Sequence, residues 1–156
     1  MVSERLAIKL AELKRRLAHE KLTIDLRSNP AFEFIEFVED NEAFERVMVL
    51  FDGAYRYDAK PDFIFRALEP SEPYTEWLMG HLKPFRVGEE VLLWFSGMNV
   101  ASLIRIKLLL PDWFDYLVDL GDLHFVLLSP DWRTGSILIE DEHQCELFIL
   151  NPRLEN

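Results

Sequence analysis

The sequence predicts an α+β fold in which N-terminal helices pack on one face of a mainly C-terminal antiparallel sheet. Residues 3–20 carry the apolar periodicity of a helix, whereas residues 123–150 contain three short apolar runs separated by two polar turns. The first pattern indicates an amphipathic helix, and the second is typical of an antiparallel meander. Helical segments followed by strand segments favour this class over alternating βα units.

Length and composition predict a single domain over residues 1–156. The chain is 49% apolar and 13% aromatic, which is ample material for a core. A single cysteine, Cys145, excludes an internal disulfide and favours a reducing compartment. The first residues lack a signal-peptide pattern and no apolar run is long enough to cross a bilayer, so we expect a cytoplasmic location without membrane contact.

The acidic charge of the chain is unevenly distributed. The net charge is −11, but residues 1–27 hold seven Lys/Arg and four Asp/Glu, a net of +3, which leaves −14 on residues 28–156. A body with this charge repels phosphate backbones, so we expect no nucleic-acid binding. The basic residues of the first segment either form the solvated face of a helix, which is the favoured interpretation, or contact an acidic partner.

The first predicted helix spans residues 3–20, and Ser3 is a suitable N-cap. One apolar stripe follows from the 4-3-4 spacing of Leu6, Leu10, Leu13 and Leu17. The stripe fits either a dimerising coiled coil or a helix that packs on the sheet. Because the stripe is short for a coiled coil, packing on the sheet is favoured.

The next segment is acidic and aromatic. Residues 31–40 read AFEFIEFVED, which predicts a helix with an acidic face, with a strand as the competing interpretation. Residues 41–51 continue as a second helix or turn into a strand at 47–51. Asp52 and Gly53 are expected to end this element in a turn.

The middle of the chain contains less regular patterns. Residues 62–68 fit a short edge strand or a helical turn, and Ser71–Leu82 reads as a helix that Pro84 stops. Residues 91–95 form a short apolar run typical of a buried strand.

Two further elements precede the meander. Residues 99–110 fit a helix capped by Asn99, although the alternation at 104–108 also fits a strand, and the helix is favoured. Asp112–Leu120 reads as a short acidic helix that Gly121 ends.

The register of the last hairpin can be predicted from its pattern. If residues 141–143 form the turn, Ile139 faces Cys145 and Ile137 faces Leu147. This register places Cys145 in the core, where a thiol is unreactive.

Acidic residues suggest a metal or acid–base site. Asp112, Asp115 and Asp119 fall on one helical face, and residues 140–143 form a second acidic group that could bind a hard cation. A solvated helix face and a charged hairpin turn explain the same residues, and this explanation is favoured because no metal-binding motif is present. We therefore expect no cofactor, and an enzyme is the less favoured alternative.

A hairpin turn at residues 129–135 suggests recognition instead, because it holds Trp132 and Arg133, residue types enriched in interface hot spots. Trp132 is either exposed for binding or folded back over the sheet, and folding back is favoured. The predicted partner-binding residues are Asp131, Trp132, Arg133, Glu140, Asp141, Glu142 and His143.

These features predict a small acidic cytoplasmic domain that binds a basic protein partner, such as an immunity or inhibitor protein. In acidity, size and single cysteine the chain is similar to small bacterial immunity proteins and antitoxins, a likeness of composition that implies neutralisation of a basic partner. The alternatives are a small metal-dependent or acid/base hydrolase that uses Asp and Glu groups, and a structural homodimer with no ligand.

Overall fold

The structure is a computed structural model of the chain. It describes residues 3–56, 58–66, 76, 80–82, 85–98, 100–120, 124–140 and 144–150. Within these residues the helices are α1 (Glu4–Arg27), α2 (Asn41–Tyr55) and α4 (Trp113–Leu120). The strands are β1 (Phe32–Val38), β2 (Phe63–Arg66), β3 (Glu90–Phe95), β4 (Leu103–Leu108), β5 (Phe125–Leu128), β6 (Gly135–Glu140) and β7 (Gln144–Leu150).

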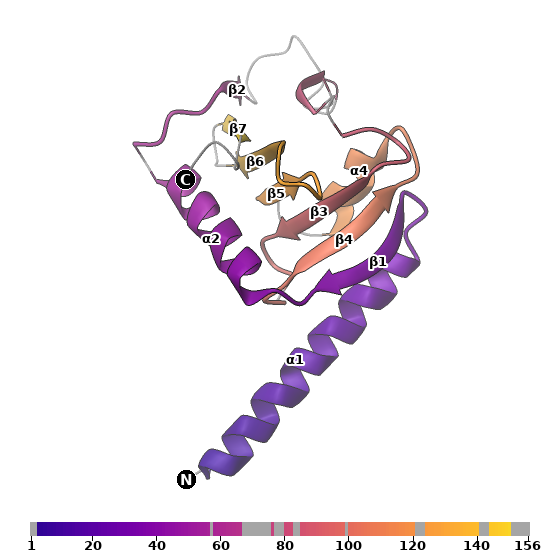
Figure 1. Cartoon of the computed structure of the whole chain (residues 1–156), viewed down its shortest axis with the longest axis vertical. Coiled ribbons are helices and arrows are strands. Elements are labelled where there is room, and N and C mark those ends of the chain that lie inside the picture. Colours follow the sequence, from indigo (N-terminus) through magenta and orange to yellow (C-terminus); the bar gives the residue numbers. More distant parts are fainter. Residues whose placement is uncertain are drawn as a thin grey trace.

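The strands form one antiparallel sheet, and the predicted α+β class is confirmed. The strand order is β1-β4-β3-β5-β6-β7-β2, so β1 and β2 lie at the two edges. Figure 1 shows α2 beside the sheet and α1 projecting away from it, with the N-terminus far from the body. The helix expected over Ser71–Leu82 and its stop at Pro84 lie mostly outside the described residues, as does the helix end expected at Gly121.

Helix α1 begins as predicted but continues to Arg27. The Ser3 Oγ accepts a hydrogen bond from the Leu6 amide at 3.2 Å, which caps the first turn. Only Leu22 and Leu26, near the C-terminal end, are buried. The expectation that the leucine stripe packs on the sheet is therefore wrong, because the helix meets the body beyond the stripe.

Two segments that were expected to be helical are strands. Residues 31–40 contain β1, which pairs with β4, and residues 99–110 contain β4, which lies between β1 and β3. The aromatic residues of β1 suit a pleated surface, and pairing on both sides satisfies the backbone of β4. Residues 62–68 fitted an edge strand or a helical turn, and the structure has the strand β2 there, which pairs with β7.

The second helix is longer than expected. Asp40 Oδ1 accepts a hydrogen bond from the Ala43 amide at 3.1 Å and caps α2, which then runs to Tyr55. The turn expected at Asp52 and Gly53 is absent, and both residues lie inside the helix.

Helices cover both faces of the sheet, not one face as expected. Trp113 and Phe114 of α4 pack with the end of α1 in one apolar cluster. Val47 of α2 packs in a second cluster on the opposite face. Successive residues of β3 show the division, since Leu92 belongs to the second cluster and Leu93 to the first.

The C-terminal meander is present, but its last register differs by one residue from the prediction. Glu140 faces Cys145 and Leu138 faces Leu147, whereas Ile139 was expected opposite Cys145. The reason is that both faces of these strands are apolar and covered. The apolar pattern then fits either register and does not select one. Cys145 is nevertheless buried in the first cluster, as expected.

Candidate functional site

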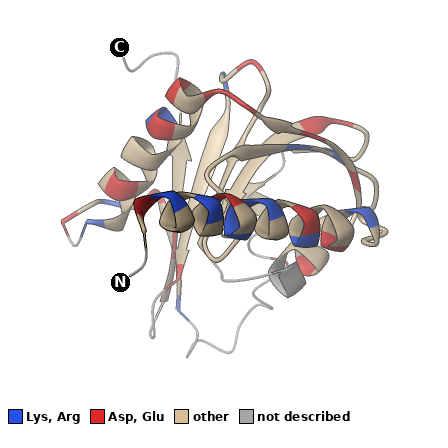
Figure 2. Cartoon of the chain, turned by 90° about the horizontal axis from the view of Figure 1, so that it is seen from below, with Lys and Arg blue, Asp and Glu red and all other residues tan. Residues whose placement is uncertain are grey.

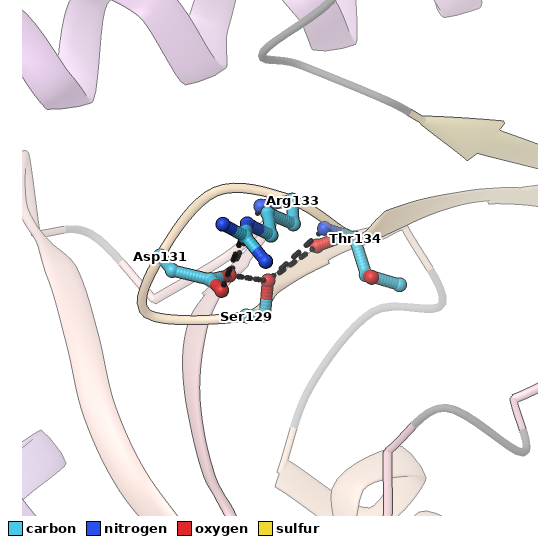
Figure 3. A network of polar contacts seen from close by, with 4 residues as sticks. All are labelled: Ser129, Asp131, Arg133 and Thr134. Atoms are coloured by element: carbon cyan, nitrogen blue, oxygen red, sulfur yellow. Dashed lines mark hydrogen bonds and ion pairs between the residues drawn. The ribbon is translucent and has the colours of Figure 1, made fainter.

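The turn between β5 and β6 is closed by its own polar groups (Figure 3). The Ser129 hydroxyl donates to Asp131 Oδ1 at 2.7 Å and accepts from the Thr134 amide at 3.0 Å. Asp131 Oδ1 also accepts from the Arg133 amide at 3.0 Å, and its Oδ2 lies 3.7 Å from Arg133 Nε. Two of the predicted partner-binding residues thus hold each other within the turn, while both side chains remain exposed.

Trp132 lies in the same turn and is folded back on the body. Its φ is 63°, in the left-handed region that non-glycine residues rarely adopt. The half-buried indole packs against the second cluster, and the guanidinium carbon of Arg46 lies 5.0 Å from the centre of its ring. The favoured interpretation, folding back, agrees with this geometry, and the turn is thereby attached to α2.

The second group of predicted residues lies at the other end of β6. Glu140 is half-buried, and its amide donates to His124 Nδ1 at 3.1 Å. Asp141, Glu142 and His143 lie outside the described residues. A six-residue strand is roughly 20 Å long, so Glu140 and the 129–134 turn do not form one site.

The largest exposed concentration of acids in the described residues is elsewhere, on β1, α2 and the connection between them. We call this surface the acidic edge. Residues 32–55 contain seven Asp/Glu and one Lys/Arg, a net of −6. All seven acids are exposed: Glu33, Glu36, Glu39, Asp40, Glu42, Glu45 and Asp52. The one basic residue, Arg46, is placed over the Trp132 ring, which brings the 129–134 turn next to the acidic edge.

Few of these acids are neutralised by a neighbouring base. Glu36 lies 3.8 Å from Arg105, which also pairs with Glu90. Sequence reasoning registered the acids at 33–40 but assigned them to the face of a helix. In the structure Glu33 and Glu36 lie on the edge strand β1, and Glu39 and Asp40 lie on the connection that leads into α2.

Helix α1 carries the second exposed surface, which we call the leucine seam. Leu6, Leu10, Leu13 and Leu17 are 47%, 44%, 40% and 52% exposed, and Ile24 is 67% exposed. Figure 2 shows Lys and Arg residues distributed along the same helix. A continuous row of exposed leucines is unusual for a soluble helix and marks a contact surface.

An open groove of about 1180 Å³ lies where α1 leaves the body. Its helical wall carries Lys9, Glu12, Leu13, Arg15, Arg16 and His19, and its other wall carries Glu39, Asn41, Ala101 and Ser102. The two walls differ in charge, with most of the cations on α1.

Among the residues that the structure describes, no group of three or more His, Cys, Asp or Glu side chains is placed to hold a metal ion. Cys145 is buried, and the Nδ1 atom of His124 is occupied by the Glu140 amide. In the same part of the chain, no helix combines the length and apolar character that a membrane crossing requires.

Comparisons with known proteins add no family. No protein-family model matches the sequence, and neither a curated protein nor a solved structure matches the chain.

Proposed function

We propose that this chain is a cytoplasmic protein-binding domain that holds a basic protein partner through the acidic edge, as an immunity or inhibitor protein does. The observation that supports this function best is the exposure of all seven acids on β1, α2 and their connection, with one base among them. The proposed contact surface is therefore the acidic edge, whereas the sequence predicted the two hairpin turns.

Electrostatics gives the acidic edge a role in association. A patch of one sign attracts a basic partner over a distance set by the Debye length, about 8 Å at physiological salt. Such attraction mainly accelerates encounter and selects against acidic competitors. The affinity of the complex then depends on contacts at closer range.

The 129–134 turn is suited to supply one of these close contacts. Trp132 is half-buried beside Arg46, and Arg133 is exposed on the same turn. A tryptophan that is already held in place loses little conformational freedom when a partner covers it. Trp132 and Arg133 could therefore contact the same partner as the neighbouring acidic edge.

Affinity capture from the native host tests this function. The wild-type protein should retain a basic protein at low salt and release it as salt is raised. Glu42→Lys with Glu45→Lys, which reverses two charges of the acidic edge, should abolish capture. Glu4→Lys with Glu12→Lys makes the same change in net charge on α1 and should leave capture intact. Equal loss in both variants would mean that only net charge matters, and the proposal would fail.

A further inference from the structure

We infer that the leucine seam of α1 is a docking site for an acidic amphipathic helix of another protein, which pairs with α1 as a two-stranded coiled coil. This inference goes beyond the proposed function, because it concerns another element and a partner of opposite charge. It rests on the spacing of the seam, the direction in which the seam faces, and the charges that flank it.

The spacing of the seam is that of a heptad repeat. Apolar residues alternate at intervals of four and three from Leu6 to Leu17, and the same series continues through Glu20 to Ile24. This is the a/d pattern that places side chains along the contact line of a coiled coil. The seam spans roughly 27 Å of helix at 1.5 Å per residue, enough for a partner helix to contact along several turns.

Most of the seam faces away from the body of the protein, and Leu13 borders the groove between α1 and the body. Leu26 is fully buried against the body, and it lies roughly 180° around the helix axis from Leu17 at 100° per residue. Since the body covers the side of α1 that carries Leu22 and Leu26, the opposite side stays open. A second molecule can reach the seam without displacing any described contact.

The flanking charges decide which molecule fits. Four exposed cations border the seam, Lys9 and Arg16 on one side and Lys14 and Lys21 on the other. These are the g and e positions of the heptad, which face the partner helix. A helix with Glu or Asp at its own e and g positions would form ion pairs along both sides.

A second copy of this chain does not fit in the same way. In a parallel pair the g residues of one helix face the e residues of the other, and in an antiparallel pair e faces e and g faces g. Every such contact between Lys9, Lys14, Arg16 and Lys21 is repulsive. A parallel pair would also bring the two Glu20 carboxylates together at a d position.

An anionic membrane surface is the other ligand that suits a helix of leucines and lysines. A membrane extends beyond α1 and would come close to residues 28–156, which carry −14, whereas a single helix lies along α1 alone, so the repulsion is larger for the membrane. The charge distribution therefore favours an acidic helix, with Glu20 positioned to pair with a Lys or Arg at one core position of that partner.

Titration with a synthetic peptide tests the inference on the intact protein. The probe has three heptads with Leu at a and d and Glu at e and g, and the control peptide has Lys at e and g. The acidic peptide should bind in a 1:1 complex that weakens with salt, and the basic peptide should not bind. Absence of binding by the acidic peptide, or equal binding of both, would overturn the inference.

Two matched pairs of variants locate the contact. Leu17→Gln on the seam should weaken peptide binding by at least about tenfold, whereas Ile8→Gln on the other side of the helix should not. Ile8 is a fair control because the two residues are 52% and 55% exposed. Arg16→Glu should likewise weaken binding, and its neighbour Arg15→Glu, at a position away from the seam, should leave it unchanged. Equal effects within either pair would contradict the predicted geometry.

The rival ligands give distinct results. Light scattering that shows a wild-type dimer, dissociated by Leu17→Gln, would assign the seam to a second copy. A second result would be that the protein floats with phosphatidylserine-containing vesicles, that Leu17→Gln abolishes flotation, and that the acidic peptide does not bind. This result would assign the seam to a membrane surface. Either result would overturn the inference. A monomer that binds the acidic peptide and not the vesicles supports it.

Discussion

The guanidinium of Arg46 lies over the indole ring of Trp132, with its central carbon 5.0 Å from the ring centre. Arg46 belongs to α2, and Trp132 belongs to the turn between β5 and β6. This contact attaches a turn that is otherwise closed by its own hydrogen bonds to a helix distant in the sequence. It also gives Trp132 a structural role, whether or not a partner covers it.

Trp132 and Arg46 should be energetically coupled. Trp132→Ala removes the packing against the second cluster and should lower the free energy of unfolding by about 1–3 kcal/mol. In a double-mutant cycle with Arg46→Ala, the double variant should lose less stability than the two single variants lose in sum. The difference should be about 0.5–1 kcal/mol, the value of a partly exposed cation–π pair. Urea denaturation of the four proteins measures this coupling, and strict additivity would contradict it.

Gly135, at the start of β6, leaves no room for a side chain. A Cβ at this position would lie 2.5 Å from Leu128 Cδ2 and 3.2 Å from Leu150 Cβ. Because Leu128 is fully buried, Gly135→Ala should destabilise the protein by about 1–3 kcal/mol. Gly53→Ala is the control, since nothing lies within 4 Å of its Cβ inside α2, and it should stabilise by about 0.5–1 kcal/mol. Thermal melts measure the stability of both variants. If Gly135→Ala does not lower the melting temperature, β5 and β7 must shift to make room for the methyl group.

The two sides of α1 should differ in their effect on stability. Leu26 is fully buried, so Leu26→Ala should lower the free energy of unfolding by about 2–5 kcal/mol. Leu17 is 52% exposed, so Leu17→Ala should change it by less than about 0.5 kcal/mol. Chemical denaturation measures both. A large loss for Leu17→Ala would show that the seam packs within the protein.

Cys145 should react slowly in the native protein. Its side chain is buried in the first cluster, and a thiol shielded from water is a poor nucleophile. A thiol-labelling reagent should modify the native chain far more slowly than the chain in denaturant. Similar rates in both states would place Cys145 at the surface and contradict the observed register of β6 and β7.

The sequence predicted the fold class and the meander, because several segments there repeat the same signal. It failed at β1 and β4, where an amphipathic helix and a strand were both compatible with the pattern. Arg105 shows what was missing, since it pairs with Glu36 of β1 and Glu90 of β3. These partners come together only when the sheet forms, so no local window contains the information.

The candidate site was predictable only in part. The turn residues were recognised, and the packing of Trp132 depends on Arg46, which lies far away in the sequence. The leucine stripe was recognised as well, but its exposure depends on how little of α1 the body covers. The predicted register of β6 and β7 was wrong for a related reason. Because helices cover both faces of the sheet, burial no longer distinguishes the two sides of a strand.

The strand order has a consequence for how the chain folds. Phe32 of β1 pairs with Leu108 of β4, and Phe63 of β2 pairs with Leu147 of β7. Each edge strand therefore pairs with a strand much later in the sequence. Closing such long loops lowers the rate of folding, and this topology should fold more slowly than a helical bundle of equal length. The backbone hydrogen bonds of helix α1 join residues close in the sequence, whereas the sheet is completed only after β7 has been synthesised.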